Sequence, residues 1–200
     1  MDVHPAPGLA PSGLIDGARA VVLVEGASDA AALAALAICQ GRDLDADGVA
    51  IVPMGGATSV GRFLLRLGPR GLDLPVVGLC DTREVPFVHR ALAAAGIATV
   101  TTRAETERAG FFVCVRDLED ELIRALGPDA VEEVLERHQD LARFRRFQRQ
   151  PAHREQPVTQ QLHRFLGTTS GRKEAYARRL VEAAGPARAP EPLRAVLARA

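Results

Sequence analysis

Short apolar runs alternate with amphipathic segments over the first two thirds of the chain. Runs rich in β-branched and aromatic residues predict four strands, at 20–25, 49–53, 75–80 and 111–115. Apolar residues at helical spacing predict helices over 29–40, 57–67 and 84–95. Strands and helices that alternate in this way are typical of a mostly parallel sheet with right-handed crossovers. We therefore expect an α/β fold with about four strands flanked by helices.

The remaining segments set the expected domain organisation. Residues 97–101 form a further apolar run that predicts a short strand, and the pattern from 117 onward is helical. We divide the chain into a flexible segment rich in proline and glycine over 1–18, an α/β core over 19–126, and a helical, basic C-terminal region over 127–200 that completes or packs on the core.

Acidic residues follow three of the predicted strands. Glu25 ends the first strand, and Asp29 opens the helix after it. Asp81 ends the third strand, and Glu119 lies in an acidic stretch after the last one. The carboxyl ends of parallel strands open onto the functional crevice of such a sheet. Carboxylate oxygens are the ligands that Mg²⁺ and Mn²⁺ prefer, so the pattern predicts a divalent metal site.

A purely structural explanation exists for the first acidic pair. A carboxylate at Asp29 stabilises the start of a helix, and Ser28 is available as its N-cap. On Glu25 and Asp29 alone, the structural and functional interpretations weigh equally. The second acidic strand end, at Asp81, favours the metal site.

The combination of Glu25-Gly26, Asp29 and a later strand ending in Asp81 resembles the Toprim domain. This domain is shared by topoisomerases, bacterial primases, recombination-mediator proteins and OLD-type nucleases. The resemblance implies a Toprim-like Rossmannoid sheet and a metal-dependent phosphoryl-transfer site. The usual pattern has Asp-x-Asp after the later strand, whereas Arg83 stands at the second aspartate here. A second ligand from this loop then depends on Glu84.

Within the Toprim proteins, the sequence is most similar to the OLD-like nuclease branch. The glycine turn at 53–57, the acidic helix at 118–122 and the basic motif at 171–173 carry this likeness, which spans residues 20–180. It implies that a basic residue, Lys173, neutralises charge that develops on the phosphate. Lys173 is the only lysine in the chain. Nothing resembles the ATPase domain of full-length OLD proteins, which leaves a separate ATPase partner as one option.

Basic residues gather in the C-terminal region although the formal net charge of the chain is +0. Residues 137–179 contain eleven Arg or Lys against three Asp or Glu. We select as candidates for contact with a nucleic-acid phosphate backbone Arg143, Arg146, Arg149, Arg172 and Lys173. The alternative is a solvated helical surface. The interleaved phenylalanines are expected to pack inward, and the histidines at 138, 153 and 163 to lie on the surface.

The remaining features are consistent with a cytoplasmic protein. The three cysteines have no metal-ligand spacing, and neither a signal peptide nor a membrane-spanning apolar run is recognisable. The only tyrosine, Tyr176, lies in a basic helical segment outside any nucleophile motif, which disfavours topoisomerase chemistry. Oligomeric state is left open, with a homo-oligomer as one option.

The sequence thus predicts a Mg²⁺- or Mn²⁺-dependent enzyme that acts on nucleic acid, in the first instance a nuclease. Glu25, Asp29, Asp81 and Glu119 are the expected metal ligands, and Glu25, Asp81 and Lys173 the expected catalytic residues. DNA versus RNA and hydrolysis versus nucleotidyl transfer stay open. The alternative is a catalytically degenerate Toprim module that binds or regulates, with Arg83 placing its own charge at the second metal position.

Overall fold

The computed structural model describes residues 15–167 and 171–200, and a parallel sheet lies at its centre. The strands are β1 (Ala20–Val24), β2 (Val49–Pro53), β3 (Val76–Asp81) and β4 (Phe111–Cys114). Their order across the sheet is β2-β1-β3-β4, and every neighbouring pair is parallel. The predicted α/β class with a four-stranded parallel sheet is confirmed, and the predicted strand ends are correct to within one residue.

Helices cover both faces of this sheet. On one face lie α1 (Ala27–Cys39) and α10 (Glu191–Arg199), and on the other α2 (Val60–Leu67) and α3 (Val85–Ala95). A 3₁₀ turn, η2 (Ala57–Ser59), precedes α2. Residues 21–24 of β1 alternate between the two cores and are all fully buried. Burial on both faces explains why the strands read as continuous apolar runs.

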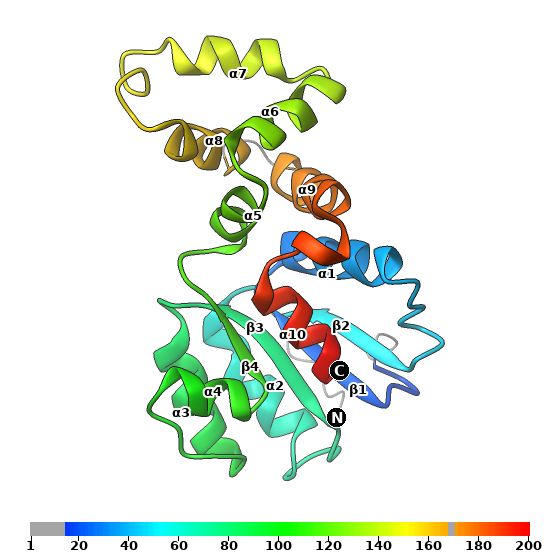
Figure 1. The fold of residues 1–200 in the computed structure, drawn as a ribbon. Helices are drawn as coiled ribbons and strands as arrows, with labels where there is room; N and C mark the ends of the chain where they lie inside the picture. The colour runs from blue at the N-terminus through cyan, green and yellow to red at the C-terminus, as the bar shows by residue number, and fades with distance from the viewer. Residues whose placement is uncertain (1–14, 168–170) are drawn as a thin grey trace, which may run out of the picture.

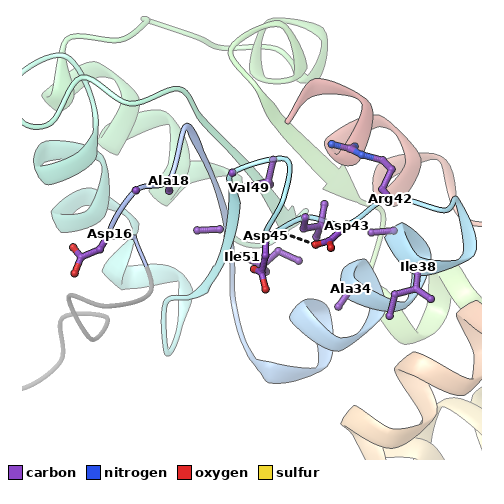
Figure 2. Close-up of a pocket in the computed structure, with 14 residues that line it drawn as sticks. Asp16, Ala18, Ala34, Ile38, Arg42, Asp43, Asp45, Val49 and Ile51 are labelled. Carbon is purple, nitrogen blue, oxygen red and sulfur yellow. Dashed lines mark hydrogen bonds between the residues drawn. The ribbon is translucent and has the colours of Figure 1, made fainter.

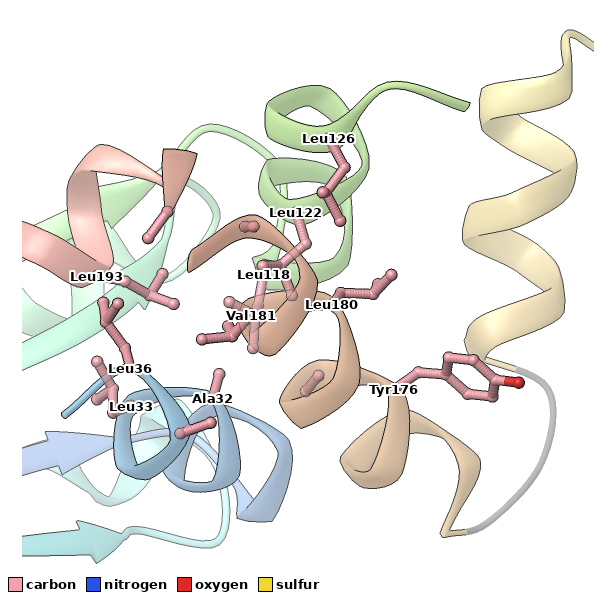
Figure 3. Close-up of a cluster of buried hydrophobic side chains, with 14 of the residues drawn as sticks. Ala32, Leu33, Leu36, Leu118, Leu122, Leu126, Tyr176, Leu180, Val181 and Leu193 are labelled. Carbon is pink, nitrogen blue, oxygen red and sulfur yellow. The ribbon is translucent and has the colours of Figure 1, made fainter. Parts of the chain in front are cut away.

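The C-terminal helices return to the α/β core. Helix α9 (Arg172–Arg188) packs along α1 and against α5 (Leu118–Leu126). Figure 3 shows Leu36 of α1, Leu122 of α5, Leu180 of α9 and Leu193 of α10 meeting in one apolar cluster. The division of the chain at residue 126 stays a prediction, but helices from both sides of it share this cluster.

Three helices extend from the core as a helical arm, which we define as residues 128–167 (Figure 1). The arm consists of α6 (Pro128–Arg137), α7 (Leu141–Gln148) and α8 (Val158–Gly167). Phe144 and Phe165 are buried, with ring centroids 5.2 Å apart, and the Phe147 ring lies 5.6 Å from that of Phe165. The phenylalanines of the arm therefore pack inward, as predicted. Within the described residues, no helix has both the length and the apolarity needed to span a membrane.

The strand predicted over 97–101 is wrong. Gly96 ends α3 in the left-handed conformation, and the chain then passes in irregular structure to α4 (Arg103–Arg108). The amides of Thr101 and Thr102 donate to the Glu105 carboxylate at 2.8 and 3.0 Å. These donors are satisfied by a helix cap instead of a neighbouring strand. The apolar Ile97 that suggested a strand packs against the core without joining the sheet.

Candidate metal centre

Three carboxylates meet where β1 and β3 end side by side. Glu25 follows β1, Asp81 is the last residue of β3, and Glu84 comes three residues later. One ligand oxygen from each lies within 4.8 Å of those of the other two. Glu84 is held there because its Oε2 accepts the backbone N–H of Asp81 at 3.0 Å. We call Glu25, Asp81 and Glu84 the strand-end cluster.

Glu84 supplies the second carboxylate of this loop, which the usual Toprim pattern places at residue 83. Arg83, which stands at the expected aspartate, has an exposed side chain. The loop therefore supplies its second carboxylate one residue later than the usual Toprim pattern. A second oxygen ligand from this loop is geometrically available.

The strand-end cluster concentrates negative charge in a partly buried place. Burial, then the charges of Glu84 and Asp117, raise the pKa of Asp81 to about 8. Burial and the neighbouring Glu25 also raise the pKa of Glu84 to about 7, against the lowering effect of the hydrogen bond from the Asp81 N–H. A bound divalent cation would relieve this repulsion, and an all-oxygen donor set suits Mg²⁺ or Mn²⁺. The donor set thus fits the metal that the sequence predicts.

Asp29 lies beside this cluster and has a structural task of its own. Its Oδ2 accepts the N–H of Gly26 at 3.0 Å, and Gly26, not Ser28, is the N-cap of α1. The predicted Ser28 cap is wrong because the helix begins two residues earlier than predicted, at Ala27, which places Ser28 inside the first turn. Burial raises the pKa of Asp29, although the Gly26 amide and the charge of Lys173 oppose the shift.

A second group forms at the base of the helical arm. Asp117 is the N-cap of α5, Glu119 lies in the first turn of that helix, and His163 comes from α8. One ligand atom from each lies within 4.8 Å of the others. His163 Nε2 is 2.7 Å from Asp117 Oδ2. We call Asp117, Glu119 and His163 the helix-base cluster.

Contacts between the loops bring the two clusters together. The Thr82 hydroxyl, directly after Asp81, donates to the Val115 carbonyl at 2.7 Å. The Val115 N–H in turn donates to Glu121 Oε1 at 2.8 Å, which ties the end of β4 to α5. Asp117 is close enough to Asp81 for its charge to raise the pKa of Asp81. The two clusters therefore belong to one acidic region at the carboxyl edge of the sheet.

Lys173 lies inside this acidic region. It is the second residue of α9, directly after Arg172, and its Nζ is 3.4 Å from Glu119 Oε2. Although partial burial lowers the pKa of Lys173, the charges of Glu119 and Asp29 raise it more, so the ammonium is stabilised. The sequence offers Thr169 and Ser170 as candidate N-caps of this helix, and both lie outside the described residues.

Sequence reasoning missed two members of the helix-base cluster. Asp117 follows β4 much as Asp81 ends β3, so the strand-end rule could have selected it together with Glu119. His163 was expected on the surface, and this expectation is wrong because the side chain is only 20% exposed and contacts Asp117. No local signal identifies it, since its partner is 46 residues away in sequence.

Comparison with known proteins relates both the sequence and the fold to one protein family. Residues 18–82 match the family described as "Overcoming lysogenization defect protein-like, TOPRIM domain". The structure is similar to the C-terminal region of the Xanthomonas campestris pv. campestris OLD protein, with a TM-score of 0.67, 25% identity and coverage of 94% of each chain. No curated protein sequence matches significantly.

The chain therefore resembles the OLD-like TOPRIM domain, and the match covers residues 18–82. A second structure, the C-terminal region of the Burkholderia pseudomallei OLD protein, shares the fold at a TM-score of 0.64 and 23% identity over 90% of this chain and 96% of that chain. TOPRIM domains of the OLD family generally process nucleic acids with the help of metal ions. The predicted resemblance to the Toprim domain and to its OLD-like branch is confirmed.

Tyr176 of this OLD-like chain is unsuited to a covalent role. Its side chain is 1% exposed, and its hydroxyl donates to Asp140 Oδ2 at 2.8 Å. Burial and the hydrogen bond to Asp140 raise its pKa above the ordinary value. Tyr176 therefore braces α9 against the arm, in agreement with the exclusion of topoisomerase chemistry from the sequence.

The basic candidates for nucleic-acid contact differ in whether their side chains already have a partner within the protein. Arg146 and Arg149 are exposed, and neither forms an ion pair with another described residue. Arg143 pairs with Asp140 at 3.0 Å. The guanidinium of Arg172 lies 4.4 Å from the centroid of the Phe165 ring. The freest charges are thus those on α7 and just after it.

A hollow of about 800 Å³ lies away from the acidic region (Figure 2). It is lined by Ala18 before β1, by Val49 and Ile51 of β2, and by Ala34 and Ile38 of α1. None of the residues of either cluster lines it. The hollow and the acidic region are therefore separate places on the molecule.

Proposed function

We propose that this protein is a divalent-metal-dependent phosphoryl-transfer enzyme that acts on nucleic acid, and specifically a nuclease. The observation that carries the proposal is the strand-end cluster, whose three carboxylates approach within 4.8 Å of one another at the end of adjacent parallel strands. The OLD-like TOPRIM family supports it, because metal-dependent processing of nucleic acids is general in that family.

Each residue of the acidic region has a proposed task. Glu25, Asp81 and Glu84 would hold Mg²⁺ or Mn²⁺, with Asp29 buttressing the turn that carries Glu25. The metal, when bound, supplies a site that activates water and stabilises charge on the scissile phosphate. Lys173 contributes a fixed ammonium beside the same place, where it stabilises negative charge in the transition state. Glu119 orients Lys173 through their ion pair.

Binding of the substrate is assigned to the arm. Arg146 and Arg149 present exposed guanidinium groups, and Arg143, Arg172 and Lys173 add positive charge around the base of the arm. Such charges bind phosphates irrespective of base sequence. A separate ATPase partner and a homo-oligomer stay options, and a cytoplasmic location stays an expectation from the sequence.

The test is a cleavage assay on single- and double-stranded DNA and RNA with Mg²⁺ and with Mn²⁺. We expect Glu25→Gln and Asp81→Asn each to abolish cleavage. The matched controls are Glu155→Gln and Asp16→Asn, which remove exposed charges outside both clusters and should leave cleavage unchanged. Full activity in both cluster variants would contradict the proposal. Nucleic-acid binding without any metal-dependent cleavage would favour the degenerate binding module instead.

A further inference from the structure

Three arginines of the helical arm surround a second, open hollow of about 640 Å³, which we call the arginine hollow. Arg145 lies on α7, Arg149 is the C-cap of that helix, and Arg154 lies in the turn before α8. The other lining residues are Gln148 of α7 and Gln161 of α8. Of the described residues, no aspartate or glutamate lines it. The walls therefore offer hydrogen-bond donors and positive charge to an anion.

A chain of hydrogen bonds holds one wall of the arginine hollow in a single arrangement. The His153 carbonyl can only accept, so Gln161 turns its Nε2 towards it and donates at 2.8 Å. Gln161 Oε1 accepts from Gln148 Nε2 at 2.7 Å, and Gln148 Oε1 accepts from Arg145 Nη1 at 2.9 Å. Gln161 is 6% exposed, so the chain is anchored inside the arm. Each amide nitrogen also has a second N–H that this chain does not use.

The turn that carries Arg154 is fixed as well. The ring of His153, directly before it, stacks on Phe147 with centroids 4.0 Å apart and an interplanar angle of 16°. Phe147 belongs to α7, and its ring also contacts that of Phe165 on α8. Helix α7, the turn and α8 thus pack together, so the three arginines line the hollow on a preformed frame.

The charges around the arginine hollow leave a positive excess. Glu132 neutralises Arg145, because its two carboxylate oxygens accept from both Nη atoms. Arg149 forms no ion pair with another described residue. Arg154 pairs at 3.4 Å with Glu155, but the two side chains are 63% and 83% exposed, and exposed pairs of this kind are weak. Three arginines against one firmly paired carboxylate leave about two positive charges for a ligand.

Helix α8 relates the arginine hollow to the acidic region. Gln161 lines the hollow, whereas His163, two residues later, contacts Asp117 of the helix-base cluster. Residues two apart lie about 200° apart around a helix axis, and a helix is about 10 Å wide. The hollow and the acidic region therefore lie on different sides of one helix. A molecule that extends past α8 reaches both.

We propose that the arginine hollow binds the terminal phosphate of a nucleic-acid chain. A phosphate monoester carries a charge of about −2 at neutral pH, whereas an internal phosphodiester carries about −1. Guanidinium forks bind phosphate oxygens in pairs, and the second N–H groups of Gln148 and Gln161 add neutral donors. The inference rests on the proposed function for the class of substrate, and it adds which part of that substrate the arm selects.

The test measures binding alone, by fluorescence anisotropy in EDTA at one fixed salt concentration, so that no metal-dependent cleavage occurs. Oligonucleotides of one sequence, labelled internally, carry a 5′-phosphate, a 3′-phosphate or hydroxyl groups at both ends. The wild-type chain should bind at least one phosphorylated form about tenfold more tightly than the hydroxyl form. Inorganic phosphate should compete with this preference.

Substitutions then assign the preference to the arginine hollow. Arg149→Ala combined with Arg154→Ala should reduce it to less than about twofold, and the corresponding double lysine variant should recover only part of it, because an ammonium lacks the guanidinium fork. Arg164→Ala is the matched control, since it removes an exposed charge of α8 outside the hollow and should keep the preference. Circular dichroism shows whether each variant folds.

Every outcome of this experiment decides the inference. Equal binding of all three oligonucleotides by the wild-type chain would overturn it, and competition by inorganic phosphate would then mean a site for free phosphate only. A full preference in the folded double alanine variant would also overturn it. If that variant does not fold, a full preference in the double lysine variant overturns it instead. Preference for a phosphorylated end without cleavage in the metal-containing assay contradicts only the proposed function, and cleavage without the preference contradicts only this inference.

Discussion

The strand-end cluster and the helix-base cluster lie beside each other, yet they balance their charge differently. In the strand-end cluster, burial and then the charge of Glu84 raise the pKa of Asp81 to about 8. In the helix-base cluster burial also raises the pKa of Asp117, but hydrogen bonds from His163 and the Asp120 amide outweigh it and lower that pKa overall. The strand-end cluster therefore needs an added cation, whereas Glu119 of the helix-base cluster already lies beside the Lys173 ammonium.

The carboxylates of the strand-end cluster are suited to attract a metal ion, whereas the ion pair of Glu119 and Lys173 holds a charged group in place beside it. A set of like charges at the end of two strands is unstable alone and is suited to a divalent ion. An ion pair between Lys173 and a carboxylate that is 6% exposed instead fixes the direction of an ammonium.

After the loss of cleavage expected for Glu25→Gln and Asp81→Asn, the largest effect is expected from Lys173→Ala. Removing the ammonium should lower turnover about 100- to 1000-fold, as for other groups that stabilise transition-state charge, while Mg²⁺ binding at the strand-end cluster stays intact. Lys173→Arg should recover part of the rate. Single-turnover cleavage and calorimetry measure the two quantities, and Arg178→Ala on the same helix is the control. Unchanged turnover in a folded Lys173→Ala variant would remove Lys173 from the mechanism.

The next effect concerns which residue supplies the second carboxylate of the strand-end cluster. Glu84→Gln should weaken Mg²⁺ binding about 10- to 100-fold, because its oxygen lies with those of Glu25 and Asp81. Arg83→Ala should leave binding nearly unchanged, since that side chain is exposed. Calorimetric titration of both variants measures this. If Arg83→Ala strengthened metal binding and Glu84→Gln did not weaken it, Arg83 would be the residue at the second position.

A pH effect should follow from the raised pKa values. In the unfolded chain an aspartate titrates near 3.8, whereas burial and the charge of Glu84 raise the pKa of Asp81 in the folded protein to about 8, so the folded state holds more protons between these values. The metal-free protein should therefore lose stability as pH rises from about 4 to about 8. Asp81→Asn should flatten this dependence, and Mg²⁺ should restore stability at pH 8. Thermal unfolding across this range is the measurement, and a stability that rises over it would refute the assignment.

The smallest effect is expected in the arm. Arg146→Ala and Arg149→Ala should each weaken nucleic-acid binding modestly and lower the slope of log K against log salt by about 1, without changing metal binding. Arg90→Ala, on an exposed part of α3, is the control. Fluorescence anisotropy at several salt concentrations gives the slopes. Slopes equal to that of the wild type would mean that the substrate does not contact this face of the arm.

The two clusters also differ in how far sequence predicts them. Glu25 and Asp81 follow apolar runs directly, so strand ends alone place them at one edge of a parallel sheet. Lys173 could be selected because it is a lone lysine in a motif that resembles OLD-type nucleases. The contact between Lys173 and Glu119 could not be predicted from the sequence, because α9 reaches α5 only by packing back on the core. His163 could not be predicted either, because its partner Asp117 lies 46 residues away in sequence. The strand prediction for residues 97–101 failed because an apolar run does not show whether a neighbouring strand is available for pairing.

Calorimetric titration of the wild-type protein and Asp81→Asn with Mg²⁺ tests the central claim most directly. It should be done above pH 8, where Asp81 is largely ionised. The account predicts saturable binding to the wild-type chain and its loss in Asp81→Asn, with circular dichroism showing both proteins folded. A wild-type protein that binds no Mg²⁺, or an Asp81→Asn variant that binds it equally well, would contradict the account.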